Sequence, residues 1–213
     1  MNIPRLPSSV TLVAVTKTFP ADAIIEAFAL GVRYFGENYV EEFEKKYANI
    51  PQEIKDNATF HMIGHVQSRK AGDVVRLFHW VDSVDSVKLA RKLSDAAVRQ
   101  GRSLSILLEV NVAGEATKFG FDPQTLQQSV DEIIKLPNLR VEGLMVMPPQ
   151  VENQEENREV FKNAKQLLDE LSSRLAGRHL SMGTSQDYRV AIEEGSTMVR
   201  LGEAIFGPRQ LPK

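Results

Sequence analysis

Eight short apolar runs of strand length alternate along the chain with stretches that have the apolar spacing of helices. The strand candidates are residues 11–16, 32–35, 59–63, 79–83, 104–110, 139–146, 178–182 and 197–201. The helix candidates lie near residues 21–30, 37–48, 67–77, 85–100, 123–135, 153–175 and 186–194. In the helix candidates apolar residues recur three and four positions apart, as in Leu89, Leu93, Ala96 and Ala97. Parallel strands need a crossover connection, so strands separated by helices are expected to pair in parallel.

The number of units decides between the two common parallel architectures. A chain of 213 residues divided among eight units gives about 27 residues each, close to the roughly 30 residues of a βα unit. Eight units close into a barrel, whereas a doubly wound sheet usually has five or six strands. The pattern therefore predicts an α/β protein, a single (β/α)8 TIM barrel, as one domain spanning residues 1–213.

Charge and composition exclude several classes of protein. The 26 basic and 28 acidic residues give a net charge of -2, without the basic excess of a nucleic-acid or membrane surface. Cysteine is absent, which removes disulfides, thiol nucleophiles and thiolate metal sites. No apolar run approaches the roughly 18–20 residues of a membrane span, and the opening MNIPRLPSSV lacks the apolar segment of a signal peptide. We expect a cytoplasmic protein that binds neither nucleic acid nor membrane.

A lysine stands at the carboxyl end of the first predicted strand. Strand alternation places Val13, Val15 and Lys17 on one face, and barrel enzymes carry their chemistry where strands end and loops begin. Burial there lowers the pKa of an amine, and a neutral amine can attack an aldehyde to form an imine. The alternative is a lysine whose ammonium group extends to the solvated rim. The pattern alone leaves both interpretations open.

The segments after the seventh and eighth predicted strands have the composition of anion-binding loops. Residues 181–187 (SMGTSQD) lead into a helix candidate, and residues 200–204 (RLGEA) follow the eighth strand. Free N–H groups at a helix N-terminus favour an anion, and glycine lets the backbone approach it closely. Barrels often bind phosphate between these two loops. The alternative is ordinary capping of the helix by Thr184 or Ser185.

Two further polar residues stand at predicted strand ends. Arg200 lies within the eighth strand, where a buried charge is costly without a partner. It either contacts a ligand inside the barrel or pairs with a strand carboxylate such as Glu109. Asn38 follows the second strand and either hydrogen-bonds a ligand or caps the next helix.

Other chemically active residues carry weaker signals. His61 and His65 have a spacing that suits a metal on a helix, but they span a strand and a glycine turn without a third ligand, so we assign no metal site. Lys118 is a second imine candidate. Its loop, GEATKFGF, is polar and flanked by glycine, which favours a solvated lysine.

Seven stretches, in order and covering nearly all of the chain, resemble the pyridoxal 5'-phosphate (PLP) homeostasis protein family, whose fold is similar to the N-terminal barrel of alanine racemases. They are TLVAVTKTFP, YFGENYVEE, FHMIGHVQSRK, VDSVDSVKLARKL, LLEVNVAGEATKFGF, GLMVMPP and LSMGTSQDYRVAIEEGSTMVRLGEAIFG. The chain departs from the family at three points. It largely lacks a helix before the first strand, which leaves open how the barrel bottom is covered. Thr16 replaces a common serine, and Thr184 replaces the usual methionine.

The resemblance implies a set of cofactor-binding residues. These are Lys17, Asn38, Met182, Gly183, Ser185, Arg200 and Gly202. Lys17 would carry PLP as a Schiff base, while Ser185 and the backbone around the two glycines would hold the phosphate. Arg200 would face the pyridine nitrogen, with Asn38 near the ring.

An arginine at the pyridine nitrogen has a chemical consequence. Guanidinium only donates hydrogen bonds, so the ring nitrogen accepts one and stays unprotonated, which weakens carbanion stabilisation. The chain also ends at Lys213, without the second, β-rich domain of alanine racemases. We therefore expect a monomeric PLP carrier that serves PLP homeostasis, with apo-PLP enzymes as candidate recipients and no catalytic residue. The alternatives are a slow PLP-dependent amino-acid racemase and a cofactor-free Schiff-base aldolase. The aldolase would not explain why Arg200 lies beside a phosphate loop.

Overall fold

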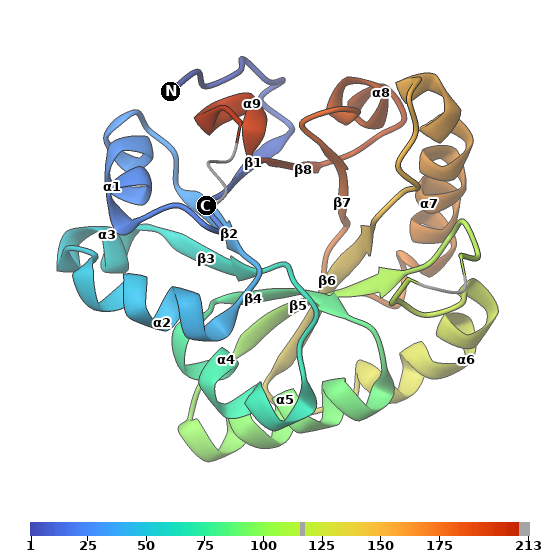
Figure 1. The fold of residues 1–213 in the computed structure, drawn as a ribbon. Helices are drawn as coiled ribbons and strands as arrows, with labels where there is room; N and C mark the ends of the chain where they lie inside the picture. The colour runs from blue at the N-terminus through green and yellow to red at the C-terminus, as the bar shows by residue number, and fades with distance from the viewer. Residues whose placement is uncertain (116–117, 209–213) are drawn as a thin grey trace.

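Eight parallel strands close into a barrel in sequence order (Figure 1). The structure, a computed structural model, describes residues 1–115 and 118–208. Its strands are β1 (Thr11–Val15), β2 (Tyr34–Glu37), β3 (Thr59–Met62), β4 (Trp80–Val84), β5 (Leu104–Val110), β6 (Leu139–Val146), β7 (His179–Thr184) and β8 (Met198–Leu201). Each strand pairs in parallel with the next, and β8 pairs with β1. The predicted (β/α)8 barrel is confirmed.

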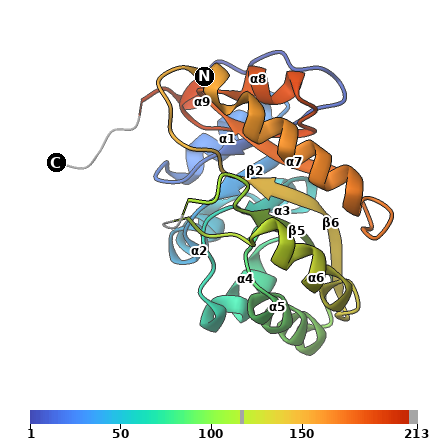
Figure 2. The same ribbon diagram turned by 90° about the vertical axis from the view of Figure 1, so that its right-hand side faces the viewer.

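The helices surround the barrel (Figures 1 and 2). They are α1 (Ala21–Ala29), α2 (Val40–Asn49), α3 (Gln52–Asn57), α4 (Ala71–Leu77), α5 (Val87–Gln100), α6 (Pro123–Ile133), α7 (Arg158–Leu171), α8 (Tyr188–Glu193) and α9 (Glu203–Phe206), with 3-10 turns at Ser68–Lys70 and Gln154–Asn157. The sequence pattern missed α3, whose six residues bury only Ile54. One buried position is too few to produce a helical period.

Local sequence signals explain where the longer helices begin and end. The Ser86 hydroxyl accepts a hydrogen bond from the Leu89 N–H at the start of α5, and Gly101 ends that helix in the left-handed region. At the start of α6 the Asp122 carboxylate accepts from two backbone N–H groups, with Pro123 in the first turn. These capped ends anchor the helices whose apolar faces cover the strands.

The apolar core has two layers because successive strand residues point to opposite faces of the sheet. The larger layer lies between the strands and the helices. The smaller one fills the barrel interior with Val13, Leu107, Met145 and Met198, and Trp80 packs against it. Burial of each such side chain contributes about 1.5–3 kcal/mol. The interior is therefore a packed core, and the space available to a ligand lies above it.

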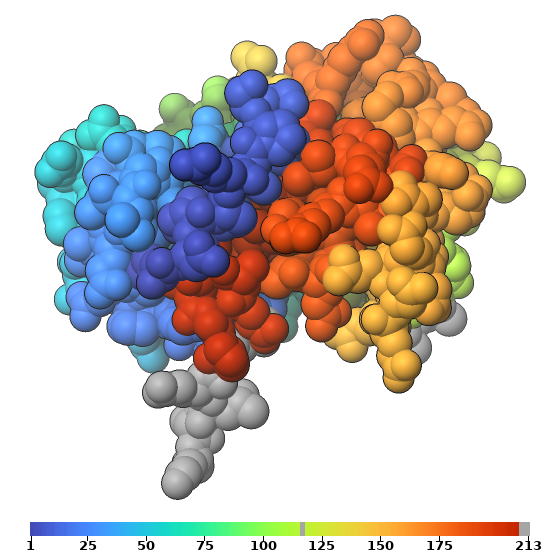
Figure 3. All heavy atoms as spheres, turned by 90° about the horizontal axis from the view of Figure 1, so that it is seen from above, coloured from blue at the N-terminus to red at the C-terminus, as the bar shows by residue number. Residues whose placement is uncertain are grey.

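Residues 1–10 contain no helix or strand; they form an irregular segment with a turn at residues 8–10. The Asn2 N–H donates to the Ile205 carbonyl at 3.1 Å, and Ile3, Leu6 and Val10 pack against the core. In Figure 3 this segment, in dark blue, lies between the blue residues of α1 and the red C-terminal residues. The segment thus covers the barrel beside β1 and β8. Within the described residues, no helix has the length and apolar character needed to cross a membrane.

Candidate functional site

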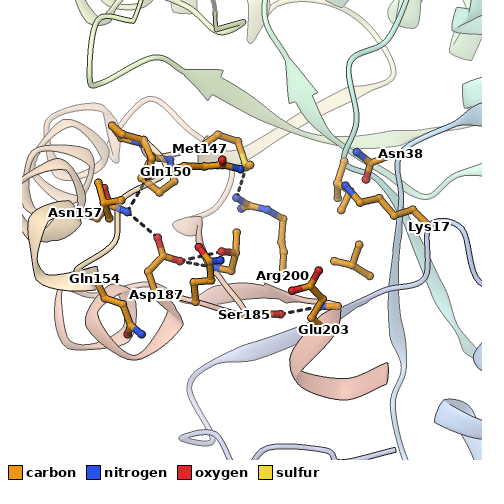
Figure 4. Close-up of a pocket in the computed structure, with 18 residues that line it drawn as sticks. Lys17, Asn38, Met147, Gln150, Gln154, Asn157, Ser185, Asp187, Arg200 and Glu203 are labelled. Carbon is orange, nitrogen blue, oxygen red and sulfur yellow. Dashed lines mark hydrogen bonds between the residues drawn. The ribbon is translucent and has the colours of Figure 1, made fainter. Parts of the chain in front are cut away.

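A pocket of about 290 Å³ opens at the carboxyl ends of the strands. Its walls come from the strand ends and loops that follow β1, β2, β3, β6, β7 and β8. The lining residues are Val15, Lys17, Asn38, Ile63, Met147, Pro148, Pro149, Gln150, Val151, Gln154, Asn157, Thr184, Ser185, Gln186, Asp187, Arg200, Gly202 and Glu203. Figure 4 shows Lys17 and Asn38 on one side, Asn157 and Asp187 on the other, and Arg200 between them.

Lys17 reaches the pocket because it continues the inward row of β1. Val13 lies in the barrel interior and Val15 lines the pocket floor beside Lys17, in agreement with the predicted alternation. Lys17 is half-buried. Asn38 lies next to it (Figure 4), and its side-chain oxygen is buried without a hydrogen-bond partner among the described residues. A buried acceptor without a partner costs free energy, so this oxygen is suited to a ligand donor.

Arg200 lies beneath the pocket on β8 and is only 4 % exposed. Its Nη1 donates to Ser181 Oγ at 2.7 Å, and its Nη2 donates to the Val146 carbonyl at 3.0 Å. Burial lowers the pKa of Arg200, and nearby carboxylates oppose that effect. Within residues 1–115 and 118–208, Arg200 forms no salt bridge with Glu109, so the direct ion pair considered from the sequence is not the arrangement here.

The loops after β7 and β8 meet at the Ser185 hydroxyl. Ser185 Oγ accepts hydrogen bonds from the Gly202 N–H at 3.2 Å and from the Ala204 N–H at 3.1 Å. Two N–H groups aimed at one point are the geometry that backbone anion-binding cradles use, and in this structure the Ser185 hydroxyl lies at that point. The helices here are short, with six residues in α8 and four in α9, so the aimed N–H groups matter more than any helix dipole.

Neither Thr184 nor Ser185 caps α8 by a side-chain hydrogen bond. The N-cap is Asp187, which is 4 % exposed and accepts from both the N–H and the hydroxyl of Thr184. Asn157 donates to the other oxygen of Asp187 at 3.0 Å. These bonds fix the loop between β7 and α8 and leave the Ser185 hydroxyl for the cradle.

Met182 and Gly183 lie beside the pocket but not on its wall. Met182 is fully buried in the layer between strands and helices. Gly183 has a φ of +94°, and a Cβ there would come within 2.7 Å of Ala191 Cβ and 2.9 Å of Tyr188 Cα. Gly183 therefore lets α8 pack close to β7 and so places the cradle.

Several polar and charged side chains are buried inside the barrel and do not line the pocket. His61 Nδ1 and Asp82 Oδ1 are 2.8 Å apart, and both side chains are fully buried. Burial raises the pKa of Glu109 to about 7, with a contribution from Asp85, while Arg200 lowers it.

His65 does not join His61 in one site. It pairs with Asp85 and stacks on a phenylalanine ring near the barrel mouth, so the two histidine rings do not converge.

Lys118 does not line the pocket. Its ammonium group donates to the Pro148 carbonyl at 2.7 Å and pairs with Glu115 at 2.7 Å. These bonds hold the loop after β5 against the loop after β6.

The loop after β6 forms a wall of the pocket that the sequence pattern did not predict. This wall includes Met147, Pro148, Pro149, Gln150, Gln154 and Asn157. The available signal was the position of GLMVMPP at the end of a predicted strand, because all eight strand ends meet at the same barrel face.

The sequence matches the family model described as alanine racemase, N-terminal domain, over residues 3–210. It is 41% identical over 207 residues to the pyridoxal phosphate homeostasis protein of Vibrio alginolyticus, covering 96% of this chain and 89% of that one. It is 39% identical over 202 residues to the protein of the same name in Aquifex aeolicus, covering 93% and 87%.

Solved structures agree with these relatives. PipY of Synechococcus elongatus without PLP aligns with a TM-score of 0.88 at 39% identity, covering 95% of both chains. PipY with PLP bound aligns with a TM-score of 0.86 at 38% identity and the same coverage. An alanine racemase of Clostridium difficile shares the fold at 19% identity with a TM-score of 0.77, covering 96% of this chain and 57% of that one. The chain therefore belongs to the alanine racemase N-terminal domain family and, within it, to the pyridoxal phosphate homeostasis proteins.

Proposed function

We propose that this protein binds PLP in the pocket, holds it as a Schiff base on Lys17 and serves intracellular PLP homeostasis as a reversible carrier. The observation that carries the proposal is the convergence of a lysine amine, a buried guanidinium and a backbone anion cradle on one pocket. PipY, a relative of similar length, has a structure with PLP bound. Apo-PLP enzymes are the proposed recipients, and the proposed working form is a monomer.

The residues present fit the three chemical parts of PLP. The phosphate requires N–H donors, which Gly202 and Ala204 supply around the Ser185 hydroxyl. The ring carries a hydroxyl donor, and the buried Asn38 oxygen has no protein partner among the described residues. The aldehyde requires an amine, which Lys17 supplies from the same side of the pocket as Asn38 (Figure 4).

Lys17 forms the covalent bond in this proposal. Its neutral amine adds to the aldehyde carbon, and both nitrogen-bound hydrogens then leave with the carbonyl oxygen as one water. A C=N bond replaces the C=O bond, and water reverses the step, which is what a carrier requires. When bound, PLP supplies an electron sink for chemistry at amino groups.

Arg200 orients the ring by donating to the pyridine nitrogen. Three of its five N–H donors have partners among the described residues, namely Ser181 Oγ, the Val146 carbonyl and Met147 Sδ. Because guanidinium cannot accept a hydrogen bond, the ring nitrogen stays unprotonated and the electron sink stays weak. This favours carriage of the cofactor over carbanion chemistry.

The racemase alternative lacks support at the pocket wall. A racemase needs a second acid–base group facing the first across the substrate. Among the described residues, no tyrosine lines the pocket, and Tyr39 at the start of α2 is 56 % exposed. We therefore favour the carrier.

Visible absorbance tests the proposal. The protein mixed with PLP should develop an absorption band that neither free PLP nor the protein shows. Lys17→Ala should lose this band and keep the far-ultraviolet circular dichroism of the fold. Lys118→Ala is the matched control and should keep the band. A band that survives in Lys17→Ala and disappears in Lys118→Ala would reject the assignment.

A further inference from the structure

A buried ionic network holds the chain on both sides of Lys17. It consists of Thr16, Glu37, Glu42 and Lys46, which we call the Lys46 network. None of these four residues lines the pocket. Glu37 is fully buried and the Lys46 side chain is 8 % exposed, a burial of charge that is costly unless the groups are well paired.

Lys46 Nζ is the centre of this network. It donates to Glu37 Oε1 at 2.7 Å and to Glu37 Oε2 at 3.0 Å, and it lies 2.7 Å from Glu42 Oε1. It also donates to the backbone carbonyl of Thr16 at 2.7 Å. Desolvation raises the pKa of Glu37, and the charge of Lys46 opposes that rise.

The network reaches the backbone immediately before and after Lys17. The Thr16 carbonyl accepts from Lys46, and the Thr16 hydroxyl donates to Glu37 Oε1 at 2.7 Å. On the other side, the Thr18 N–H donates to Glu42 Oε1 at 2.6 Å. Both peptide groups that flank the Lys17 Cα are therefore tied to charged side chains of α2, and Glu37 of β2 holds the Thr16 hydroxyl.

The turn held in this way is strained. The Phe19 N–H donates to the Thr16 carbonyl at 3.1 Å, which closes a four-residue turn with Lys17 at its second position. Thr18, at the third position, has a φ of +68°, which a type II turn requires but a β-branched residue rarely adopts. Strain of this kind persists only where the surroundings impose the conformation. The hydrogen bond from the Thr18 N–H to Glu42 is one of the contacts that hold this conformation.

We propose that Glu42 and Lys46 are positioning residues that hold the Lys17 turn so that the lysine amine faces the ligand aldehyde. This inference rests on the proposed function, because Lys17 must form the Schiff base for its position to matter. The proposed phosphate cradle and Arg200 belong to β7, β8 and their loops, and among the described residues no hydrogen bond or ion pair joins them to the network. Loss of the network should therefore slow imine formation without weakening the binding of the phosphate and ring.

Glu42 offers the sharpest variants because its side chain is 29 % exposed. The same Glu42 atom, Oε1, contacts both the Thr18 N–H and Lys46. In Glu42→Gln the amide oxygen can take the place of Oε1, because the glutamine side chain has the same length. Glu42→Asp keeps the charge but withdraws the oxygen by one methylene group, and Glu42→Ala removes it. Glu41→Ala is the matched control, because Glu41 is the neighbouring residue of α2 and pairs with Lys70 at the surface.

The experiment separates imine formation from binding. The rate of pyridoxyl–Lys17 formation is measured by mixing full-length protein with PLP and quenching with borohydride at increasing times. Binding is measured with pyridoxamine 5'-phosphate, which has an amine in place of the aldehyde and cannot form the imine. Glu42→Ala and Glu42→Asp should react about tenfold more slowly and bind the analogue within twofold of wild type. Glu42→Gln and Glu41→Ala should react within about threefold of wild type.

Amide hydrogen exchange of the ligand-free protein gives a readout that is independent of PLP. The Thr18 amide should exchange at least about tenfold faster in Glu42→Ala than in Glu41→Ala. Unchanged reaction and exchange rates in Glu42→Ala would overturn the positioning role, as would an equal loss of analogue binding, which would indicate general unfolding of the site. Absence of pyridoxyl on Lys17 in wild type would instead reject the proposed function.

Discussion

Arg200 is a buried cation whose hydrogen-bond partners among the described residues are all neutral. The partners are a serine hydroxyl, a backbone carbonyl and a methionine sulfur, while Asp82, Glu109 and Asp187 act on it only through space. A buried charge without a direct ion pair is costly, and a ligand acceptor in the pocket would offset part of that cost. The sequence predicted the strand position of Arg200 but not its neutral surroundings, because a pattern of residue types does not show which side chains reach one another.

Replacement of Arg200 by alanine should weaken PLP retention and leave imine formation on Lys17 intact. One charge-assisted hydrogen bond to the ring contributes roughly 1.5–3 kcal/mol, or about ten- to a hundredfold in affinity. Equilibrium dialysis of PLP measures the change. Arg189→Ala, at an exposed position of α8, is the control and should bind as wild type does. Equal affinities for Arg200→Ala and wild type would indicate that Arg200 has only a structural role.

Glu109 makes the stability of the ligand-free protein depend on pH. Its folded-state pKa of about 7 exceeds the ordinary value of 4.5, so the folded protein retains a proton that the unfolded chain releases between these values. Stability from this group is present below pH 4.5 and is lost as the pH rises to 7. The Glu109→Gln variant has no titrating carboxyl group at this position, so its stability should not fall over this pH range.

Urea unfolding of wild type and Glu109→Gln at pH 5, 6, 7 and 8 tests this linkage. The variant should gain about 1–3 kcal/mol of unfolding free energy relative to wild type between pH 5 and pH 8. Stability profiles that run parallel across this range would show that the carboxyl group of Glu109 does not titrate there.

The strands and most helices could be predicted because a closed barrel buries both faces of each strand. Long apolar runs such as β5 and β6 were predicted with their observed bounds. β2 was placed two residues too early because it continues through Gly36 and Glu37 to pair with β3, and this polar pair has no apolar pattern. The Lys46 network escaped prediction for the same reason, since it is formed by charged residues whose burial only the tertiary structure reveals.

Gly183 should tolerate no side chain. Alanine at this position would meet α8 at 2.7 Å and would also need the left-handed φ of +94°. The expected loss is about 2–4 kcal/mol of unfolding free energy, from backbone strain and overpacking together. Gly101→Ala is the matched control, because Gly101 also has a positive φ but an added Cβ there would meet no atom within 4 Å, and it should lose only about 1 kcal/mol. Equal losses in the two variants, measured by urea unfolding, would show that close packing against α8 is not the cause.

At the scale of the whole molecule, one barrel provides the pocket proposed for PLP on a packed interior. The interior layer of Val13, Leu107, Met145 and Met198 supports the pocket floor, and Lys17 and Arg200 reach the pocket from the neighbouring strands β1 and β8. The sequence predicted this arrangement because barrel strands end at one face. It did not predict the wall from the loop after β6, whose prolines and amides resemble an ordinary surface loop.

The carrier hypothesis predicts little turnover of amino acids. Deuterium exchange at the α-carbon of alanine in heavy water should stay near the rate given by free PLP. A positioned acid–base group contributes about 10^2 to 10^4 in rate, and among the described residues no tyrosine or histidine lines the pocket to act as the second one. Lys17→Ala is the control for protein-dependent exchange. Fast exchange with inversion that depends on Lys17 would favour the racemase.

The attachment of PLP to Lys17 is tested most directly by borohydride reduction of the PLP-loaded protein followed by peptide mapping. Reduction converts the imine to a stable amine and adds the pyridoxyl mass to the lysine that formed it. The proposed function predicts this mass on the peptide that contains Lys17. Label on the peptide that contains Lys118, with Lys17 unmodified, would contradict it.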